Sequence, residues 1–566
     1  MTSTTALVLA GGSLAGKTLG PSPLLSRSPA ELPDGSGFAL DHIRERLNNA
    51  PSITSLMVVV DADQPHARPM RGRQQWQCLT IPAQPSVLAS LEAALAVIST
   101  EQVLVQPITT LPPTSLPEGC WIGLGDQALP RENWSAVSAL DADAPQFHPK
   151  QQPRTDHEPD SHPFTGLISA PTARLRQLLA ERQQQPGWTP SSDLDLLSVA
   201  EGLWMQGDTR LERVPWLDLG HRATASRRRL SRLTSRGFNS VSYCASDDLI
   251  RKRSKDATRL AQEAAYFEAL PQPLQRYFPA CLSHEPGQLE LEYIPFPSLA
   301  ELFLHWQIGP NSWRQLMQRL SRVRTGLGEA PAITPPPPVT VDWLYSRKLQ
   351  QRLEQLQRQP PLLADGSHWT DWWTRGWTLK LCARHGDATH TLTLPSPAAA
   401  ATSLLEHLPS LEASRPLQRI HGDLCFNNIL AEPQSGSIRL IDPRGERPDG
   451  APWPIGFGDP RYDQIKLLHS GRYLYDVVVN DLFSLEKLSP GHLRLHLDVP
   501  AHYDALQQAM DSSGLLQGLL PEEERWLTSS LFVSMLPLHR EDGDRCLAFI
   551  AIGMMILEAK FDAVLR

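Results

Sequence analysis

The chain has 566 residues, of which 41% are hydrophobic and 20% are charged. This length and composition predict two or more globular domains, each with its own core. A formal net charge of -8 without a long basic tract argues against a nucleic-acid partner. The seven cysteines form no CxxC pair, which argues against a zinc site or a disulfide framework and favours a reducing compartment.

Neither a membrane partner nor secretion is expected. The longest apolar run, residues 546–557, is too short to span a bilayer and indicates a buried helix. The N-terminus lacks the basic start and apolar core of a secretion signal. We therefore expect a cytoplasmic protein.

A glycine-rich loop follows the first predicted strand, residues 6–10. Residues 11–18 match the phosphate-binding pattern GxxxxGK[ST], and residues 57–61 could supply its acidic strand. A true phosphate loop also needs a helix that begins at Lys17, so that free backbone amides face the phosphates. The prolines at positions 21 and 23 would break that helix. The sequence therefore disfavours a true phosphate loop.

Strand and helix patterns alternate over the N-terminal part. We expect strands at 57–60 and 103–105 and helices at 87–98 and 173–185. Residues 7–12, residues 37–47 and the Trp-x-Asp-x-Gly segment within 214–221 resemble the sugar nucleotidyltransferases. The resemblance implies a doubly wound α/β domain over residues 1–222. In that family the glycine loop holds a nucleoside triphosphate, and the Asp at the position of Asp218 binds the catalytic metal.

This resemblance fails at the second metal ligand. An Asp is expected after the strand at 103–105, but residues 106–110 are Gln, Pro, Ile, Thr and Thr. Lys17 is the only candidate for the basic residues of the glycine loop. A lone carboxylate leaves most of the metal's coordination to water. We therefore expect a degenerate domain; Asp126 either replaces the missing acid or lies in a surface turn.

The pattern changes from about residue 223. Residues 233–241 predict a strand, a turn and a second strand, and a further strand ends at Lys252. The helix that follows has an apolar face from Leu260 to Leu270, with Glu263 beside it. A loop over phosphates, a strand Lys and a helix Glu follow one another in this way in the small lobe of kinases.

The run from His421 to Asp442 combines three oxygen-bearing side chains. Asp423 can accept a proton from a hydroxyl, and Asn428 and Asp442 offer the hard oxygen ligands that Mg²⁺ prefers. Residues 429–430 and 437–441 predict two strands joined by a turn. Such a hairpin would bring Asn428 and Asp442 to the same end, where they could share one metal.

Together these segments resemble the aminoglycoside phosphotransferase and choline kinase superfamily, in particular domains linked to surface-polysaccharide synthesis. The resemblance implies that Lys252 contacts the α- and β-phosphates of ATP and that Glu263 positions Lys252. Asp423 would be the catalytic base, and Asn428 and Asp442 would hold Mg²⁺. As alternatives, Lys252 is a solvated surface residue and Glu263 only belongs to a polar helix face.

The same resemblance implies further nucleotide contacts. Gly237, Asn239 and Ser240 belong to the loop over the phosphates, and the strand at 289–294 leads to the adenine hinge through Glu292 and Ile294. As an alternative, Gly237 only forms a turn.

Several flanking residues have structural roles in this interpretation. The segment 457–466 looks like the family's Gly-Asp-Pro-x-Tyr-Asp segment, in which Asp459 would cap a helix that starts near Pro460 and Asp463 would be structural. His421 would brace its loop through hydrogen bonds, and Phe426 would pack. Arg444 binds a phosphate or an acidic substrate, or forms a surface salt bridge.

The remaining segments carry no visible chemistry. Residues 385–387 repeat His-Gly-Asp without the later Asn and predict only a turn. Four prolines at 335–338 indicate an extended spacer. Residues 398–401 indicate an irregular insertion, within a stretch of unassigned role at 365–416. The chain beyond residue 466 reads as helices.

The sequence thus predicts a nucleotidyltransferase-like α/β domain before a bilobal, protein-kinase-like α+β fold with a small lobe at 223–297 and a large lobe at 298–566. We expect an enzyme that uses ATP and Mg²⁺ to phosphorylate a hydroxyl of a small-molecule substrate, such as a sugar, an amino alcohol or a surface-glycan precursor. In one alternative the N-terminal domain is an active sugar-phosphate nucleotidyltransferase. In another, the protein is a non-catalytic regulator or scaffold. The acceptor and the oligomeric state stay open.

Overall fold

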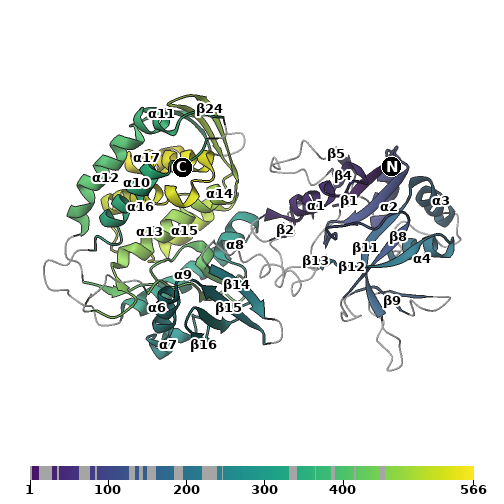
Figure 1. The fold of residues 1–566 in the computed structure, drawn as a ribbon, viewed down its shortest axis with the longest axis horizontal. Helices are drawn as coiled ribbons and strands as arrows, with labels where there is room; N and C mark the ends of the chain where they lie inside the picture. The colour runs from purple at the N-terminus through teal and green to yellow at the C-terminus, as the bar shows by residue number, and fades with distance from the viewer. Residues whose placement is uncertain are drawn as a thin grey trace. The chain divides into compact units, whose positions relative to one another are not determined.

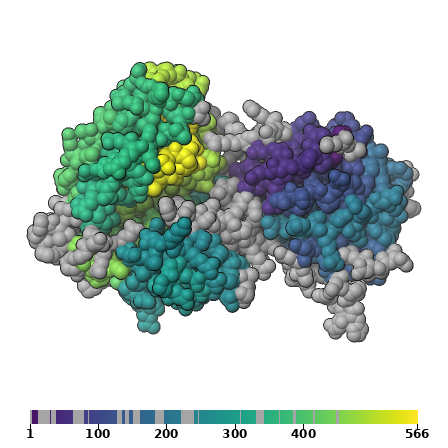
Figure 2. Space-filling model, in the orientation of Figure 1, coloured from purple at the N-terminus to yellow at the C-terminus, as the bar shows by residue number. Residues whose placement is uncertain are grey.

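The computed structural model divides the chain into two compact units, Met1–Arg232 and Leu233–Arg566. Figure 1 shows their ribbons and Figure 2 their space-filling surfaces. The structure describes residues 3–11, 29–34, 37–62, 77–82, 84, 86–126, 134–138, 145–149, 161–183, 196–219, 239–244, 247–306, 308–329, 341–363, 365–383, 389–412, 416–445, 451 and 453–565. The glycine loop beyond Gly11, the expected domain boundary near residue 222, the prolines at 335–338 and the turn at 385–387 lie outside these residues.

The first unit is built on a sheet in which four neighbouring strands are parallel. Their spatial order is β5 (Gln77–Ile81), β4 (Ile53–Asp61), β1 (Thr4–Leu9) and β6 (Gln102–Pro107). Parallel neighbours need crossover connections, and α1 (Ala39–Asn48) lies between β1 and β4 in the chain while α2 (Val87–Leu95) lies between β5 and β6. The expected strands are confirmed, as are the two helices, although α2 ends at Leu95 and residues 184–185 of the second expected helix lie outside the described residues.

Antiparallel strands extend the sheet beyond β6. The long strand β11 (Ser161–Pro171) pairs with β6 and also with β8 (Trp121–Gly125), whose other neighbour is the parallel strand β12 (Arg210–Val214). The outer part of β11 pairs with β9 (Ala136–Ser138), which pairs with β10 (Gln146–His148).

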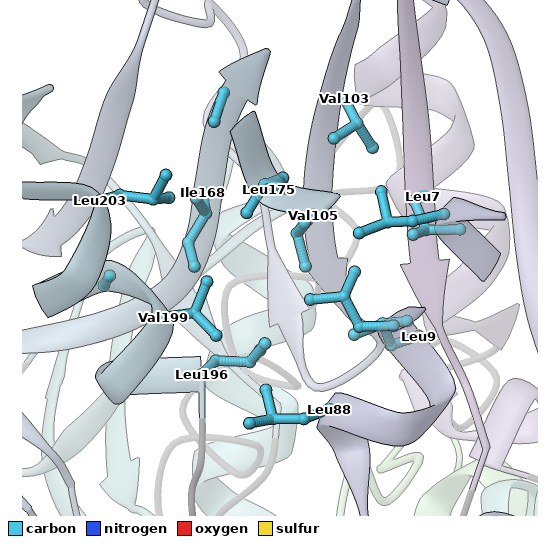
Figure 3. Packing of buried hydrophobic residues seen from close by; sticks show 14 of the residues in the cluster. Leu7, Leu9, Leu88, Val103, Val105, Ile168, Leu175, Leu196, Val199 and Leu203 are labelled. Carbon is cyan, nitrogen blue, oxygen red and sulfur yellow. The ribbon is translucent and has the colours of Figure 1, made fainter. Parts of the chain in front are cut away.

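Both faces of β1 are buried. On one face Leu7, Leu9, Val103 and Val105 pack with residues of α2, α3 (Thr172–Gln183) and α4 (Leu196–Met205), as Figure 3 shows. Ala6 and Val8 alternate with these residues along β1 and are fully buried on the other face. Helix α1 contacts β4. The near-continuous apolar sequence of β1 follows from this two-sided burial.

The second unit begins with a four-stranded antiparallel sheet. Its spatial order is β14 (Asn239–Cys244), β15 (Leu249–Ser254), β17 (Gln288–Glu292) and β16 (Cys281–Glu285). Helix α6 (Ala257–Glu268) begins at Asp256, whose side chain accepts a hydrogen bond from Arg259 N. Its buried residues include Leu260, Ala264 and Phe267, and it contacts β15, β16 and β17. The expected order of the second strand, the Lys252 strand and the helix is confirmed, whereas the first strand and turn, expected within 233–238, lie outside the described residues.

Helices dominate the remainder of this unit (Figure 1). They are α8 (Leu299–His305), α9 (Pro310–Gly328), α10 (Ser346–Arg358), α11 (Trp369–Thr374), α12 (Pro397–Glu412), α13 (Pro460–Gly471), α14 (Tyr475–Val479), α15 (Tyr503–Ser512), α16 (Pro521–Ser534), α17 (Gly543–Leu557) and α18 (Phe561–Leu565). Helix α16 packs against α10, α12, α13 and α17. All residues from Cys546 to Leu557 are buried, which confirms the expected buried helix. No described helix has both the length and the apolarity needed to cross a bilayer.

Two expectations for this unit are wrong. The chain beyond residue 466 is not all helical, because β24 (Phe483–Ser489) and β25 (His492–Leu497) form a hairpin in which Leu493, Leu495 and Leu497 are buried in alternation. Strands β18 (Trp377–Cys382) and β19 (His390–Leu394) complete a sheet of order β19-β18-β25-β24.

The second error concerns residues 398–401, which are not irregular. They lie in α12, where the Ser396 hydroxyl accepts a hydrogen bond from Ala399 N at the helix start. Its run of alanines has the highest intrinsic helix propensity.

Candidate active site

The loop before Asn428 is held by two buried side chains. The Asp463 carboxylate, on α13, accepts hydrogen bonds from His421 N at 2.7 Å and Gly422 N at 2.8 Å. The His421 ring contacts Ile441 O through Nε2 at 3.1 Å and Asp423 N through Nδ1 at 3.3 Å. One neutral tautomer satisfies both contacts, with Nε2 donating and Nδ1 accepting. Burial lowers the pKa of His421 to about 4, so that the ring is neutral. The expected bracing role of His421 is confirmed.

A close backbone approach requires glycine in this loop. Gly422 has φ +80°, and an added Cβ would lie 2.8 Å from Arg444 Cβ and 3.0 Å from Arg444 O. The segment that carries Arg444 therefore packs directly on the loop that carries Asp423. Arg444 N also donates a hydrogen bond to His421 O at 2.7 Å.

The predicted hairpin places Asn428 and Asp442 at one end. Strands β21 (Ile429–Glu432) and β22 (Ser437–Leu440) pair, and Ile441 N donates to Asn428 O at 2.9 Å. Asp442 adopts the left-handed conformation with φ 57°, which is uncommon for a residue with a side chain. Asn428 Nδ2 donates to Asp423 O at 2.8 Å, which orients its amide group.

Lys252 joins this end of the hairpin to helix α6. Its Nζ lies 2.6 Å from Glu263 Oε1 and 3.1 Å from Asp442 Oδ1. Burial alone favours the neutral amine, but the two carboxylates outweigh it and raise the pKa of Lys252. The Lys252 side chain is only 13% exposed, and Glu263 is buried. The alternatives of a solvated surface lysine and of a mere polar-face glutamate are therefore wrong.

Asp423 lies between two cations. Its Oδ1 is 2.9 Å from Lys466 Nζ, and its Oδ2 is 3.3 Å from Arg444 Nη2. Burial opposes ionisation of Asp423, but the charge of Lys466 prevails and lowers its pKa. Arg444 also lies 3.6 Å from Asp442 Oδ2. Arg444 thus links two site carboxylates: the expected salt bridge forms, but it is half-buried within the site, and binding of a phosphate or an acidic substrate stays a prediction.

Sequence reasoning assigned no role to Lys466. It lies three residues after Asp463 on α13, and residues with this spacing share one helix face. That spacing, in a segment already singled out, was the available signal. Two structural expectations nearby hold: Asp459 caps α13 by accepting from Arg461 N at 2.9 Å, and Phe426 is fully buried against Phe303.

Most of the described residues expected to contact the nucleotide lie on the same sheet as Lys252. Ser240 and Asn239 are on β14, where Val241 pairs with Lys252. The Glu292 carboxylate accepts a hydrogen bond from Ala280 N at 3.1 Å. Ile294 is buried just beyond β17. Their contacts with a nucleotide stay predictions, and Gly237 lies outside the described residues.

A cleft of about 410 Å³ opens beside the Asp423 loop. Gly422 and Arg444 form part of its wall, and α10 contributes Lys348 and Arg352. Its other lining residues are Trp343, Leu344, Gln351, Gln355, Ile420, Gly456, Phe457, Gly458 and Tyr462.

In the first unit Asp218 is buried in β13 (Leu217–Asp218), which pairs with β7 (Thr110–Leu111). Asp218 lies opposite Thr110, so the structure brings it to the segment in which the second Asp was expected. There the Gln106 amide donates to Thr110 O and, at 3.0 Å, to Pro107 O. Asp126 is exposed at the end of β8, as a surface turn requires.

Comparisons with known proteins give only distant likenesses. No family model matches the chain, and no curated protein matches it. Among solved structures, 41% of the chain covers 97% of a protein described as a glucose-1-phosphate thymidylyltransferase from Bacillus anthracis, with 13% identity and a TM-score of 0.33. The inositol-1-phosphate CTP transferase from T. maritima is covered to 90% by 39% of the chain, with 12% identity and a TM-score of 0.30. A protein described as a fructosamine-3-kinase from Thermobifida fusca is covered to 92% by 58% of the chain, with 14% identity and a TM-score of 0.33. Because the sequence identities and TM-scores are this low, these likenesses assign no function.

Proposed function

We propose that the second unit is an ATP- and Mg²⁺-dependent phosphotransferase that acts on a hydroxyl group of a small molecule. The observation that carries this proposal is the series of contacts from Glu263 through Lys252 to Asp442, which ends beside Arg444 and Asp423. Residues far apart in the sequence thus meet, and their residue types and contacts support a role in phosphoryl transfer.

The oxygen atoms at the end of the hairpin suit Mg²⁺. Asn428 and Asp442 supply hard oxygen ligands, and Mg²⁺ commonly takes one or two protein ligands together with phosphate oxygens and water. The described residues contain no cluster of three or more His, Cys, Asp or Glu side chains for a metal, so an all-protein cage is not part of the proposal. When bound, Mg²⁺ would neutralise charge on the phosphate oxygens.

In the reaction, the acceptor oxygen forms a bond to the γ-phosphorus of ATP as the bond from that phosphorus to the β,γ-bridging oxygen breaks. ADP leaves, and Asp423 accepts the hydroxyl proton. A lowered pKa makes Asp423 a weak base, but phosphoryl transfer depends mainly on positioning and electrostatic stabilisation. Lys466 would hold the Asp423 carboxylate in place, and Lys252 would bind the phosphates of ATP.

The folds belong to the same proposal. The sheet β14-β15-β17-β16 with α6, followed by a helical region, supports a bilobal, protein-kinase-like fold of the aminoglycoside phosphotransferase kind. The parallel order β5-β4-β1-β6 supports a doubly wound, nucleotidyltransferase-like first unit. A role in making surface-glycan precursors is the biological context that we propose.

The direct test is Asp423→Asn in the full chain. ADP release from Mg-ATP, in a screen of sugars and amino alcohols as acceptors, should fall by about 10²- to 10⁴-fold with the acceptor that wild type uses. Mg-ATP affinity should be nearly unchanged, because Asp423 is not a proposed metal ligand. Full turnover by the variant would contradict the assignment of the base. Asp371→Asn, in the short helix α11, is a matched control.

A second candidate function is sugar-phosphate nucleotidyl transfer by the first unit. It is favoured by the pairing of Asp218 with Thr110 just beyond β6, and by the close approach of Gly11 to Asp61 at the ends of β1 and β4. Pyrophosphate release from a nucleoside triphosphate and a sugar phosphate, abolished by Asp218→Ala, would establish it. If the chain bound no Mg-ATP at all, the scaffold alternative would return.

A further inference from the structure

The cleft beside the Asp423 loop is lined by Gly422, the residue next to the proposed catalytic base. Gly422 and Arg444 form part of its wall, and the Arg444 guanidinium lies 3.3 Å from Asp423 Oδ2. Its volume of about 410 Å³ falls in the usual range for small-molecule sites. A molecule bound here would have the Asp423 loop as one of its walls.

The cleft carries an excess of positive charge. Its described lining contains three basic side chains, Lys348, Arg352 and Arg444, and no carboxylate. Lys348 and Arg352 lie four residues apart on α10 and therefore share one helix face.

The described partners do not neutralise the two cations of α10. Lys348 Nζ donates to the Tyr462 hydroxyl at 2.6 Å, and Arg352 Nη1 donates to Gln355 Oε1 at 3.0 Å. Both partners are neutral. The charge of Lys348 also contributes to lowering the pKa of Asp423, after the larger effects of burial, Lys466 and His421. The charges of Lys348 and Asp423 therefore act on one another.

The rest of the cleft offers aromatic surface. The cleft is lined by Trp343, Phe457 and Tyr462. The Trp343 ring stacks on the Trp453 ring, with 5.6 Å between the ring centroids. Flat apolar faces of this kind can cover the C–H groups of a ring-shaped molecule.

We propose that the acceptor carries an anionic group, a phosphate monoester or a carboxylate, which Lys348 and Arg352 bind while its hydroxyl faces Asp423. This inference rests on the proposed phosphotransferase function and narrows its substrate class. Arg binds phosphate and carboxylate through a planar pair of N–H groups. A cationic amino alcohol would instead meet like charges, which carry a cost in a partly desolvated cleft.

The first test needs no known acceptor. With Mg²⁺ and a non-hydrolysable ATP analogue filling the nucleotide site, inorganic phosphate should bind saturably to the full chain in a calorimetric titration. Lys348→Met with Arg352→Met should weaken that binding at least tenfold. Arg358→Met, on the same helix and 78% exposed, should leave it unchanged. Absence of saturable binding, or equal binding by the double variant, overturns the inference.

The second test compares matched acceptors by ADP release: glucose, glucose 6-phosphate, glucuronate and glucosamine. Preference for glucose 6-phosphate or for glucuronate identifies which anionic group the cleft binds. The double variant should raise KM for the preferred member at least tenfold with a smaller change in kcat, and it should keep wild-type affinity for the ATP analogue. Efficient use of glucose or glucosamine over both anions overturns this inference but leaves the phosphotransferase standing. Failure to bind the nucleotide overturns the proposed function itself.

Discussion

Replacing Glu263 by Gln tests the central ion-pair series. Lys252 now divides its interactions between Glu263 at 2.6 Å and Asp442 at 3.1 Å. Gln keeps the size of the side chain and a hydrogen-bond acceptor but removes the negative charge. Lys252 should then interact more strongly with Asp442, the carboxylate proposed to hold Mg²⁺. The variant should therefore lose both stability and affinity for Mg-ATP.

The contacts of Lys252 determine how much stability the Glu263→Gln variant should lose. Loss of one partner from a buried ion pair costs about 3–5 kcal/mol when the other charge is left uncompensated. Here Asp442 still compensates Lys252, so the cost should approach that of one charged hydrogen bond, about 1.5–3 kcal/mol. In a unit of this size such a loss lowers Tm by roughly 2–5 °C. Competition between Lys252 and Mg²⁺ for Asp442 should weaken Mg-ATP binding about tenfold, equivalent to about 1.4 kcal/mol.

A thermal scan of the full chain and a titration with a fluorescent ATP analogue, each with and without Mg²⁺, measure the two effects. Glu290→Gln is the matched control, because Glu290 pairs with Arg251 at 2.8 Å on the same sheet but lies outside the Lys252 cluster. If Glu263→Gln left both Tm and the Mg²⁺-dependent affinity at wild-type values, the reasoning from the ion-pair series would be refuted.

Three further perturbations follow from the second unit, two at the candidate site and one at Asp476, a buried residue of α14. Asp442→Ala should weaken nucleotide binding with Mg²⁺ far more than without it; equal losses in the two titrations would speak against a metal ligand. Gly422→Ala should cost about 1–2 kcal/mol for the left-handed backbone, with an added clash against Arg444, and should lower both Tm and turnover. Burial raises the pKa of Asp476 to about 7, so the folded state retains this proton more strongly than the unfolded state, and stability falls as pH rises from about 4 to 7. Asp476→Asn should remove that loss, so in urea unfolding the variant's free energy of unfolding should exceed that of wild type by an amount that grows with pH to at most about 4 kcal/mol. A difference independent of pH would contradict a raised pKa of Asp476.

The sequence predicted those features that depend on local periodicity. The buried strand β1, the helix α6 and the hairpin β21–β22 follow from patterns within a few residues of one another. The meeting of Lys252 with Glu263 followed from their order on a strand and the next helix. The hairpin β24–β25 shows the opposite case: its alternating leucines carry the strand signal, but the surrounding helices favoured a helical interpretation.

Contacts between distant segments were the hardest to foresee. The spacing of Lys466 from Asp463 puts both on one face of α13, but the contact of Lys466 with Asp423 depends on how α13 packs beside the loop. Arg444 was noted for its position after Asp442, but its contact with Asp423 depends on the close approach that Gly422 permits. In the first unit, the pairing of Asp218 with Thr110 joins two strands of two residues each, which are too short to leave a pattern.

The charges of the site suggest where substrate selection takes place. In the candidate active site the three cations Lys252, Arg444 and Lys466 contact the three carboxylates Glu263, Asp423 and Asp442, so these six groups balance one another. His421 is neutral and adds no charge. Lys348 and Arg352 lie outside this balance, and their described hydrogen bonds go to neutral groups. Changes to these six groups should therefore affect nucleotide binding and chemistry together, whereas changes to the two cleft cations should alter the choice of acceptor and spare the nucleotide.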